Sequence, residues 1–256
     1  MTEFDDHDII DGRSTGGANT SHTIAFSHLS SLLAALPRTA GFSDYEHAAV
    51  EQNLLGRATL EGRRRTFRYL RELYLFDPER VLFRALRDLW DEDTEARPLL
   101  AGLAAFARDS VFRASGTGLL KVAPGETVSP GLLSEFVATV FPDAYNAGTA
   151  GKIGRNTASS WAQTGHLVGL SVKHRQRVVP SPASVSYALL LGHLQGYRGQ
   201  SLYDTNWTQF LDSSPREIEL LAEAASRRGY VELKSGGGVV EIGFRHLTRS
   251  IEGVKP

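Results

Sequence analysis

Helix-start signals recur along this chain, and they restrict it to a mainly α-helical fold. A Ser, Thr or Asp that precedes apolar residues at helical spacing accepts hydrogen bonds from the free N–H groups of a first helical turn. In two places a Glu follows three residues later, which is typical of a reciprocal capping pair. One unbroken helix is expected over 97–113. The predicted caps are Ser43, Thr59, Asp77, Ser129, Thr149 and Ser214.

Two segments favour strands instead. Residues 167–179 alternate well enough for a strand or hairpin, with a basic tip or edge at 173–177. Residues 230–233 and 239–242 are joined by a run of three glycines, which is a strong hairpin signal. The expected fold class is therefore mainly α with small β-hairpins. We expect a helical bundle lobe plus a winged-helix-like C-terminal lobe.

The chain divides into predicted parts. Residues 1–24 are acidic and rich in Gly, Ser and Thr, so we expect them to be disordered. Residues 25–114 are predicted to form a helical domain with a basic helix-turn-helix near 43–75. A Gly/Pro-rich break at 115–128 separates this domain from residues 129–250. The latter are expected to form a winged-helix-like domain with a C-terminal helix and hairpin.

A long stretch of the chain carries no acidic residue. Between Asp143 and Asp204 there is no Asp or Glu, although the whole chain has 29 acids among 256 residues. The stretch contains six Lys or Arg residues, so its local formal charge is +6. Because each carboxylate would repel a phosphate at close range, a surface kept free of acids suits a polyanion such as nucleic acid.

The helix predicted over 149–164 has a polar face that suits the edges of DNA bases. Arg contacts guanine, and Asn or Gln contacts adenine. Thr149 and the free N–H groups of the first turn would favour a phosphate. The alternative is a small helix packed on a basic hairpin that binds nothing. The candidate base-contacting residues are Lys152, Arg155, Asn156, Ser159 and Gln163.

A second basic helix is predicted over 59–75. Arg64, Arg68 and Arg71 fall on one side of it, and a guanidinium group matches a phosphate with two parallel hydrogen bonds. An ordinary solvated amphipathic face is the alternative. With the basic tip of the first hairpin included, the candidate phosphate-binding residues are Arg57, Arg64, Arg65, Arg68, Arg71, Thr149, Lys173, Arg175 and Arg177.

No sequence motif predicts catalysis. The chain has no cysteine, which excludes disulfides and thiolate metal sites. Residues 146–153 resemble a phosphate-binding loop, but Asn146 replaces its first glycine and Ile153 replaces its Ser or Thr. There is no metal-ligand spacing of histidines, no apolar run that could span a membrane, and no basic start typical of a signal peptide. We expect a cytoplasmic protein that is not an enzyme and that binds no cofactor or metal.

Three further patterns occur over residues 45–244. Asn53-Leu54-Leu55-Gly56-Arg57-Ala58-Thr59 precedes the Arg-rich helix. The Thr-, Asn- and Trp-bearing helix near 149–164 leads into Gly169-Leu170 and a basic segment that ends in Val-Val-Pro. Trp207-Thr208-Gln209-Phe210-Leu211 precedes the last capped helix and the glycine hairpin. In these patterns the chain resembles the BrxA family, the small accessory proteins of BREX phage-defence systems.

The resemblance implies a mostly helical DNA-binding protein with winged-helix-like units and no known catalysis; residues 1–24 lie outside the pattern. We therefore expect a non-catalytic BREX protein whose partners are double-stranded DNA and other BREX proteins, with no membrane contact. A homodimer is one expected state, because two-fold symmetric half-site binding is common among such modules. The alternatives are a protein-interaction scaffold that docks other defence subunits and an RNA-binding helical protein.

Overall fold

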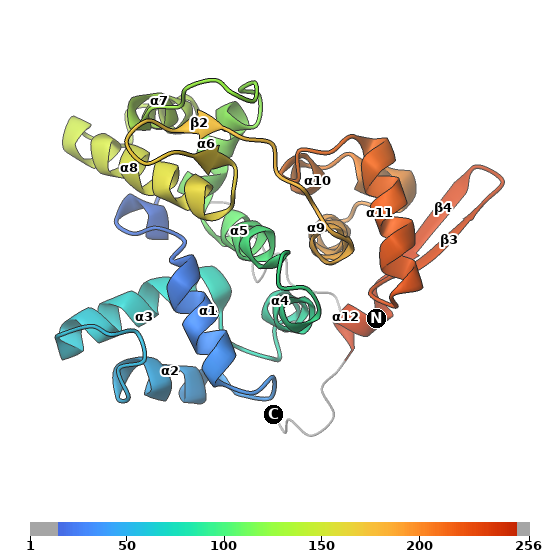
Figure 1. The fold of residues 1–256 in the computed structure, drawn as a ribbon, viewed down its shortest axis with the longest axis horizontal. Coiled ribbons are helices and arrows are strands. Elements are labelled where there is room, and N and C mark those ends of the chain that lie inside the picture. The colour runs from blue at the N-terminus through green and yellow to red at the C-terminus, as the bar shows by residue number, and fades with distance from the viewer. Residues whose placement is uncertain (1–14, 250–256) are drawn as a thin grey trace.

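The computed structural model describes residues 15–249, which form a mainly α-helical structure with two small antiparallel hairpins (Figure 1). The expected class, mainly α with small β-hairpins, is confirmed. The helices are α1 (Phe26–Ala35), α2 (Phe42–Val50), α3 (Leu60–Tyr74), α4 (Val81–Glu92), α5 (Arg97–Arg108), α6 (Ser110–Leu119), α7 (Pro130–Val140), α8 (Ala147–Gln163), α9 (Pro182–Leu194), α10 (Asn206–Gln209), α11 (Pro215–Arg227) and α12 (Arg245–Thr248). The strands are β1 (Leu167–Val168), β2 (His174–Arg175), β3 (Glu232–Gly236) and β4 (Val239–Gly243), and the 3-10 turns are η2 (Ala18–Thr20) and η3 (Gly199–Tyr203).

Helices α4, α5 and α9 pack on one another in the middle of the molecule (Figure 1). Residues 81–90 of α4 and 99–107 of α5 are buried without interruption. The buried part of α5 consists of Leu, Ala, Gly and Phe, so this helix is apolar all round, as a helix enclosed by neighbours must be. No helix of the described range, however, reaches the length and hydropathy that crossing a bilayer would require.

A glycine in α5 lets two other elements approach this helix closely. A Cβ atom on Gly102 would lie 2.5 Å from Cγ2 of Thr164 and 2.7 Å from Cζ of Phe210. Both distances are well below the separation at which carbon atoms attract one another. The end of α8 and the chain after α10 therefore pack here only because residue 102 has no side chain.

Phe106, one turn further along α5, links the two halves of the chain. Its ring centroid lies 6.1 Å from Trp161, 5.9 Å from Trp207 and 5.1 Å from Phe210, separations at which aromatic pairs stabilise a core beyond simple burial. One hydrophobic core accordingly extends from Ala18 to Leu247. It crosses the predicted boundary at 115–128, whose first residues belong to α6.

Three of the six predicted caps are confirmed. The side chains of Thr59, Ser129 and Ser214 accept hydrogen bonds from N–H groups in the first turns of α3, α7 and α11. Each bond satisfies one of the donors that a helix start leaves without an internal partner. Residues 214–217 also form the predicted reciprocal pair, since the Glu217 carboxylate accepts from Ser214 N at 2.7 Å.

The other three predicted caps are wrong, because a neighbouring residue takes the role. Helix α2 begins at Phe42, before the predicted cap Ser43. The predicted cap Asp77 closes a separate turn, and α4 begins only at Val81. Asn146 replaces Thr149 at the start of α8, where its Oδ1 accepts from Thr149 N at 2.9 Å.

The helix expected over 97–113 is broken into two at Asp109. One carboxylate oxygen of Asp109 caps α6 by accepting from Phe112 N at 2.8 Å. The other accepts from N and Nδ2 of Asn19 at 2.7 and 3.1 Å. Burial raises the pKa of this carboxyl, although hydrogen bonds from Phe112 and Asn19 oppose the shift. A short polar side chain that bonds to backbone N–H groups favours a helix start over a helix interior, which explains the break.

The bonds of Asn19 also hold the N-terminal segment against the protein. Ala18, Asn19 and Ile24 are buried, and the Ser160 hydroxyl of α8 donates to Oδ1 of Asn19 at 2.6 Å. The predicted disorder of residues 1–24 is therefore wrong for residues 15–24, since partners distant in sequence stabilise this polar segment. Residues 1–14 lie outside the described range.

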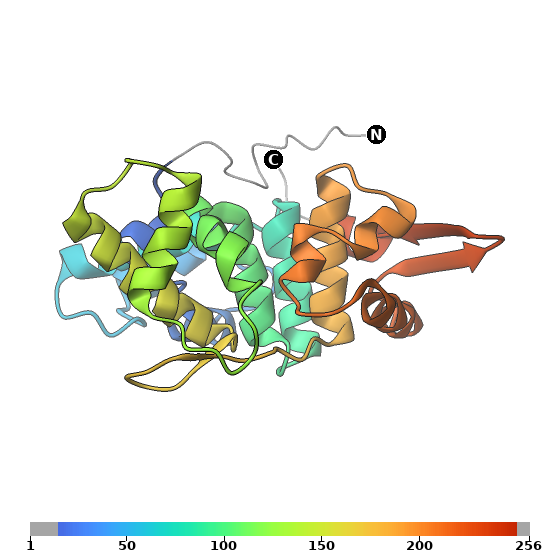
Figure 2. The same cartoon turned by 90° about the horizontal axis from the view of Figure 1, so that it is seen from above.

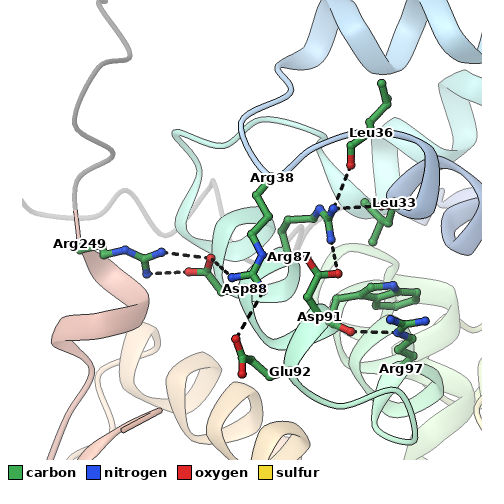
Figure 3. Close-up of polar contacts among 10 residues, drawn as sticks. Leu33, Leu36, Arg38, Arg87, Asp88, Asp91, Glu92, Arg97 and Arg249 are labelled. Atoms are coloured by element: carbon green, nitrogen blue, oxygen red, sulfur yellow. Dashed lines mark hydrogen bonds and ion pairs between the residues drawn. The ribbon is translucent and has the colours of Figure 1, made fainter.

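A polar network joins α4 to the end of α1 and to the end of α12 (Figure 3). Arg87 donates to the backbone oxygens of Leu33 and Leu36 at 3.0 Å each and to Asp91 at 2.7 Å. These bonds hold the C-terminal end of α1 on the surface of α4. Nearby, Arg249 donates to Asp88 at 2.7 Å and holds the end of α12. The network fixes the positions of α1 and α12 relative to the central helices.

Both predicted hairpins are confirmed. In the first, Leu167 pairs with Arg175 and Val168 with His174, and Thr127 forms a bridge on the other edge of β2. In the second, β3 and β4 pair over five residues each. Its two turn residues are glycines with φ of 58° and 79°, as a two-residue hairpin turn of this kind requires.

The packing at Gly102 predicts that even alanine, the smallest side chain, lowers the stability of the protein at this position. Gly102→Ala should lower the free energy of unfolding by up to about 2 kcal/mol, because overpacking costs about 1–3 kcal/mol and helix propensity returns roughly 1 kcal/mol. Gly131→Ala in α7 is the matched control, since the nearest atom to its Cβ lies 3.6 Å away, and it should be neutral or stabilising. Urea unfolding compares them; equal stabilities would contradict the packing account.

Candidate nucleic-acid interface

Helix α8 presents a basic stripe to solvent. Lys152 and Arg155 are exposed, and Ser159, one turn further, is half-buried. The ion pairs formed within residues 15–249 do not include Lys152 or Arg155. The first turn of α8 contains no acid, and the positive end of the helix dipole lies there. Three of the five predicted base-contacting residues are thus available to a ligand.

The other two, Asn156 and Gln163, are engaged by the N-terminal segment. Nδ2 of Asn156 donates to the backbone oxygen of Asn19 at 3.1 Å. Oε1 of Gln163 accepts from Phe26 N at 2.8 Å. Each of these two side chains would have to give up a bond inside the protein to reach a base.

The four arginines of α3 that were predicted to bind phosphate lie on two different sides of the helix. Arg71 lies over the ring of Phe42, and Arg64 lines a hollow beside α2 that also contains Glu46 and Glu51. Arg65 and Arg68 lie toward Tyr69, with the Arg68 guanidinium 5.4 Å from the centre of that ring. All four arginines are exposed, but only Arg65 and Arg68 face away from the acids of α2.

Helices α3 and α8 lie at the same end of the molecule in both views (Figures 1 and 2). The turn η2 contacts both helices and lies between them. The acidic helix α11 and the β3–β4 hairpin lie at the opposite end (Figure 2). The exposed cations of α3 and α8 therefore share one face, which residues 18–22 connect.

A groove runs along this junction, and we name it the His22–Arg57 groove. It consists of two adjoining hollows of about 240 and 370 Å³, both lined by His22 and Arg57. His28 and Gln163 line the first hollow, and Arg65 lines the second. Arg57 Nη2 lies 2.8 Å from Nε2 of His28. Burial lowers the pKa of His22 and of His28, and the charge of Arg57 lowers both further.

The cations predicted at the first hairpin are mostly engaged within the protein. Arg175, one of the predicted phosphate-binding residues, is only 3% exposed and pairs with Asp212, so its guanidinium group is not open to a ligand in this structure. Arg177 pairs with Glu217 of α11 at 2.9 Å. Nζ of Lys173 donates to the backbone oxygen of Gly169 at 3.1 Å. The strand that was expected to offer three cations to DNA mainly fastens the hairpin to the chain around α11.

Another cleft lies between the end of α6, the chain after β2 and α10. Its volume is about 720 Å³. Leu120, Val122 and Phe106 supply apolar walls, and Gln209 and Arg177 lie at polar positions. Within residues 15–249, no three His, Asp or Glu side chains come together as ligands for a metal ion. Lys121, Arg175 and Asp212 also line the cleft, so its walls are mixed apolar and charged.

Sequence reasoning missed His22 and His28 entirely. Residue 22 fell in the segment predicted as disordered, and residue 28 is one of several polar positions in α1, beside Ser27, Ser30 and Ser31. Nothing in their spacing indicates that they meet Arg57. The anchoring of Asn19 on Asp109 helps to hold the segment that carries His22 beside α3, whereas His28 lies on α1.

The ion pair of Arg175 predicts a structural role for this residue. Arg175→Ala should lower the free energy of unfolding by about 3–5 kcal/mol, since it leaves the Asp212 carboxylate without its charged partner. Arg177→Ala, in an exposed pair two residues away, should cost at most about 1 kcal/mol. Urea unfolding distinguishes the two, and similar small losses would show that Arg175 is not structural.

Comparison with known proteins assigns no family to the chain, because no protein-family model matches it and no curated protein has a significantly similar sequence. The resemblance to the BrxA family therefore rests on the three sequence patterns alone. Two of these patterns have local structural roles: Oδ1 of Asn53 accepts from Arg57 N at 2.8 Å, and Nε1 of the buried Trp207 donates to Gln195 at 2.6 Å.

Proposed function

We propose that the protein is a non-catalytic DNA-binding protein of a bacterial BREX phage-defence system. The observation that carries DNA binding is the concentration, at one end of the molecule, of exposed cations on α8 and α3 that form no ion pair within residues 15–249. The BREX assignment rests on the resemblance described above. The residues proposed to contact the duplex are Lys152, Arg155, Ser159, Arg65 and Arg68.

The order of elements supports a winged helix-turn-helix within residues 110–175. Helix α6, a short extended segment at 125–128, helices α7 and α8, and the β1–β2 hairpin follow one another. The extended segment pairs with β2, since Val128 N donates to Lys173 O at 2.8 Å. In helix-turn-helix modules the second helix enters the major groove. That helix is α8, so Lys152 and Arg155 would approach base edges or the flanking phosphates.

The distribution of charge supports the same orientation. The exposed arginines of α3 and the exposed Lys152 and Arg155 of α8 lie at one end of the molecule, whereas α11 at the opposite end carries Glu217, Glu219 and Glu223. A duplex approaching α3 and α8 would gain phosphate contacts and avoid those carboxylates. The formal net charge of −1 therefore does not oppose DNA binding, because the charges are segregated.

Removing the α8 cations should weaken DNA binding measurably. The double variant Lys152→Ala/Arg155→Ala should bind a random-sequence duplex about tenfold to a hundredfold more weakly at about 100 mM salt. The plot of log affinity against log salt should become shallower by about 0.9 for each phosphate that the protein no longer neutralises. Fluorescence anisotropy at several salt concentrations measures both quantities.

The matched control removes two arginines from the opposite end. Arg216→Ala/Arg227→Ala takes the same charge from exposed positions of α11 and should leave affinity and salt slope unchanged. Equal losses in both double variants would reject the α8 face as the binding site. Absence of duplex binding by the unaltered chain would reject the proposed function, and preferential competition by structured RNA would favour the RNA-binding alternative.

Docking of a protein partner is a second candidate function. Leu170 at the tip of the first hairpin is 97% exposed, Val179 is 89% exposed, and Val168 and Val172 are more than half exposed. Grouped apolar side chains in solvent are typical of protein-interaction sites.

This candidate predicts that Leu170→Asp disrupts a complex without altering DNA affinity, because the tip carries no exposed cation that needs a phosphate. Co-purification with the other subunits of the defence system measures the complex, and anisotropy measures DNA binding. Val239→Asp, at the exposed start of β4, is the control. Unchanged complexes in L170D would reject the hairpin as a docking site.

A further inference from the structure

The His22–Arg57 groove is basic. The side chains of His22, His28, Arg57 and Arg65 line its two hollows, and no Asp or Glu among residues 15–249 does. Four such groups around a cavity of this size repel one another when charged, and nothing within the groove compensates them. An anion would remove that repulsion.

The start of α1 opens into the same groove. Its N-cap residue, Ala25, supplies no side-chain cap, and its first turn contains no acid. Gln163 accepts from Phe26 N, but no hydrogen bond within the described residues engages the N–H groups of Ser27 and His28, which line the first hollow. Free N–H groups at a helix start are donors for an anion. They add to the side-chain donors of Arg57 and Arg65.

The contact between Arg57 and His28 can rearrange around an anion. A guanidinium group only donates, so Nε2 of His28 must be the acceptor and the imidazole must be neutral. Nε of Arg57 is buried and has no hydrogen-bond partner among residues 15–249. If His28 takes up a proton, its Nε2 becomes a donor and the contact with Arg57 becomes repulsive. Both groups would then donate to a third, negatively charged group.

His22 can also take up a proton and donate to an anion. Its Nδ1 lies 3.3 Å from the backbone oxygen of Thr23, and its ring packs against Tyr69 at 5.2 Å. Nε2 therefore remains for a ligand. Burial lowers the pKa of His22, and the charges of Arg57 and Arg65 lower it further; His28 experiences burial, Arg57 and His22 in the same direction. An anion in the groove would raise both pKa values.

We propose that the His22–Arg57 groove binds a phosphate group, with Arg57 and Arg65 as charged donors and His22 and His28 as donors that take up protons when the anion enters. The phosphate could belong to the DNA backbone, in which case the inference rests on the proposed function. It could also be a free phosphate group in solution, in which case the inference stands without it.

Sulfate is a suitable probe, because it is tetrahedral and its charge stays constant across the pH range in which histidines titrate. NMR spectra of the imidazole C–H protons of the full chain would be followed during sulfate titrations from about pH 7.5 to about pH 5.5. Sulfate should shift the signals of His22 and His28 and raise their apparent pKa values. Its affinity should rise by about tenfold as the pH falls by one unit for each proton taken up.

Adjacent arginines supply the matched control. Arg65→Gln should weaken sulfate binding by about tenfold or more, whereas Arg64→Gln, an exposed arginine of the same helix that faces α2, should not. Arg57→Lys keeps the charge and should retain part of the affinity. His22→Gln/His28→Gln should remove the pH dependence of sulfate binding. Unchanged thermal unfolding of these variants would show that a loss of binding is not a loss of fold.

A parallel titration with a random-sequence duplex identifies the source of the phosphate. If a backbone phosphate occupies the groove, H22Q/H28Q should also remove the pH dependence of duplex affinity, and sulfate should compete with the duplex. If sulfate binds but the affinity for the duplex does not depend on His22 and His28, the groove binds free phosphate groups. Absence of sulfate binding together with unchanged histidine signals on duplex addition would overturn the inference, even where K152A/R155A still weakens DNA binding.

Discussion

The burial of α5 on every side is the constraint on which the rest of the structure depends. Helices α3, α6, α8 and α9 can all pack on it because its central residues are small or apolar. Gly102 permits the closest approach, and Phe106 extends into an aromatic cluster with Trp161 and Phe210. Through this cluster the elements before and after residue 120 share one core. A change in α5 would therefore displace the proposed DNA-binding helix without touching its surface.

The buried Asp109 connects the core to the candidate interface on the surface. Asp109, at the end of α5, holds Asn19 by two hydrogen bonds, and Asn19 accepts a bond from Ser160 of α8. This chain of contacts fixes residues 18–24 between α8 and α3. The same anchoring covers Asn156 and brings His22 beside Arg57 and Arg65. One buried carboxylate thus determines which polar groups of the interface are engaged and which remain open to a ligand.

Local signals in the sequence predicted the helices, the two hairpins and half of the caps, because capping and turn geometry depend on neighbouring residues. Partners distant in sequence determine which of the predicted site residues are engaged inside the protein, and the sequence patterns did not reveal them. Arg175 looks like a free cation in a basic hairpin, yet its partner Asp212 is distant in sequence and lies on the far side of the acid-free stretch. Gln163 looks like a base-contacting side chain, yet it caps the start of α1. Helical spacing predicted the exposure of Lys152 and Arg155 correctly, since their face depends on α8 alone.

The central claim is that a DNA duplex contacts the face formed by α8 and α3. Hydrogen–deuterium exchange of the full chain, with and without a saturating random-sequence duplex, tests it most directly. Slower exchange should appear in peptides from the starts of α8 and α3 and from residues 20–28, with no change in α11 or the β3–β4 hairpin. Protection confined to α11 and that hairpin, or no protection anywhere, would contradict the account.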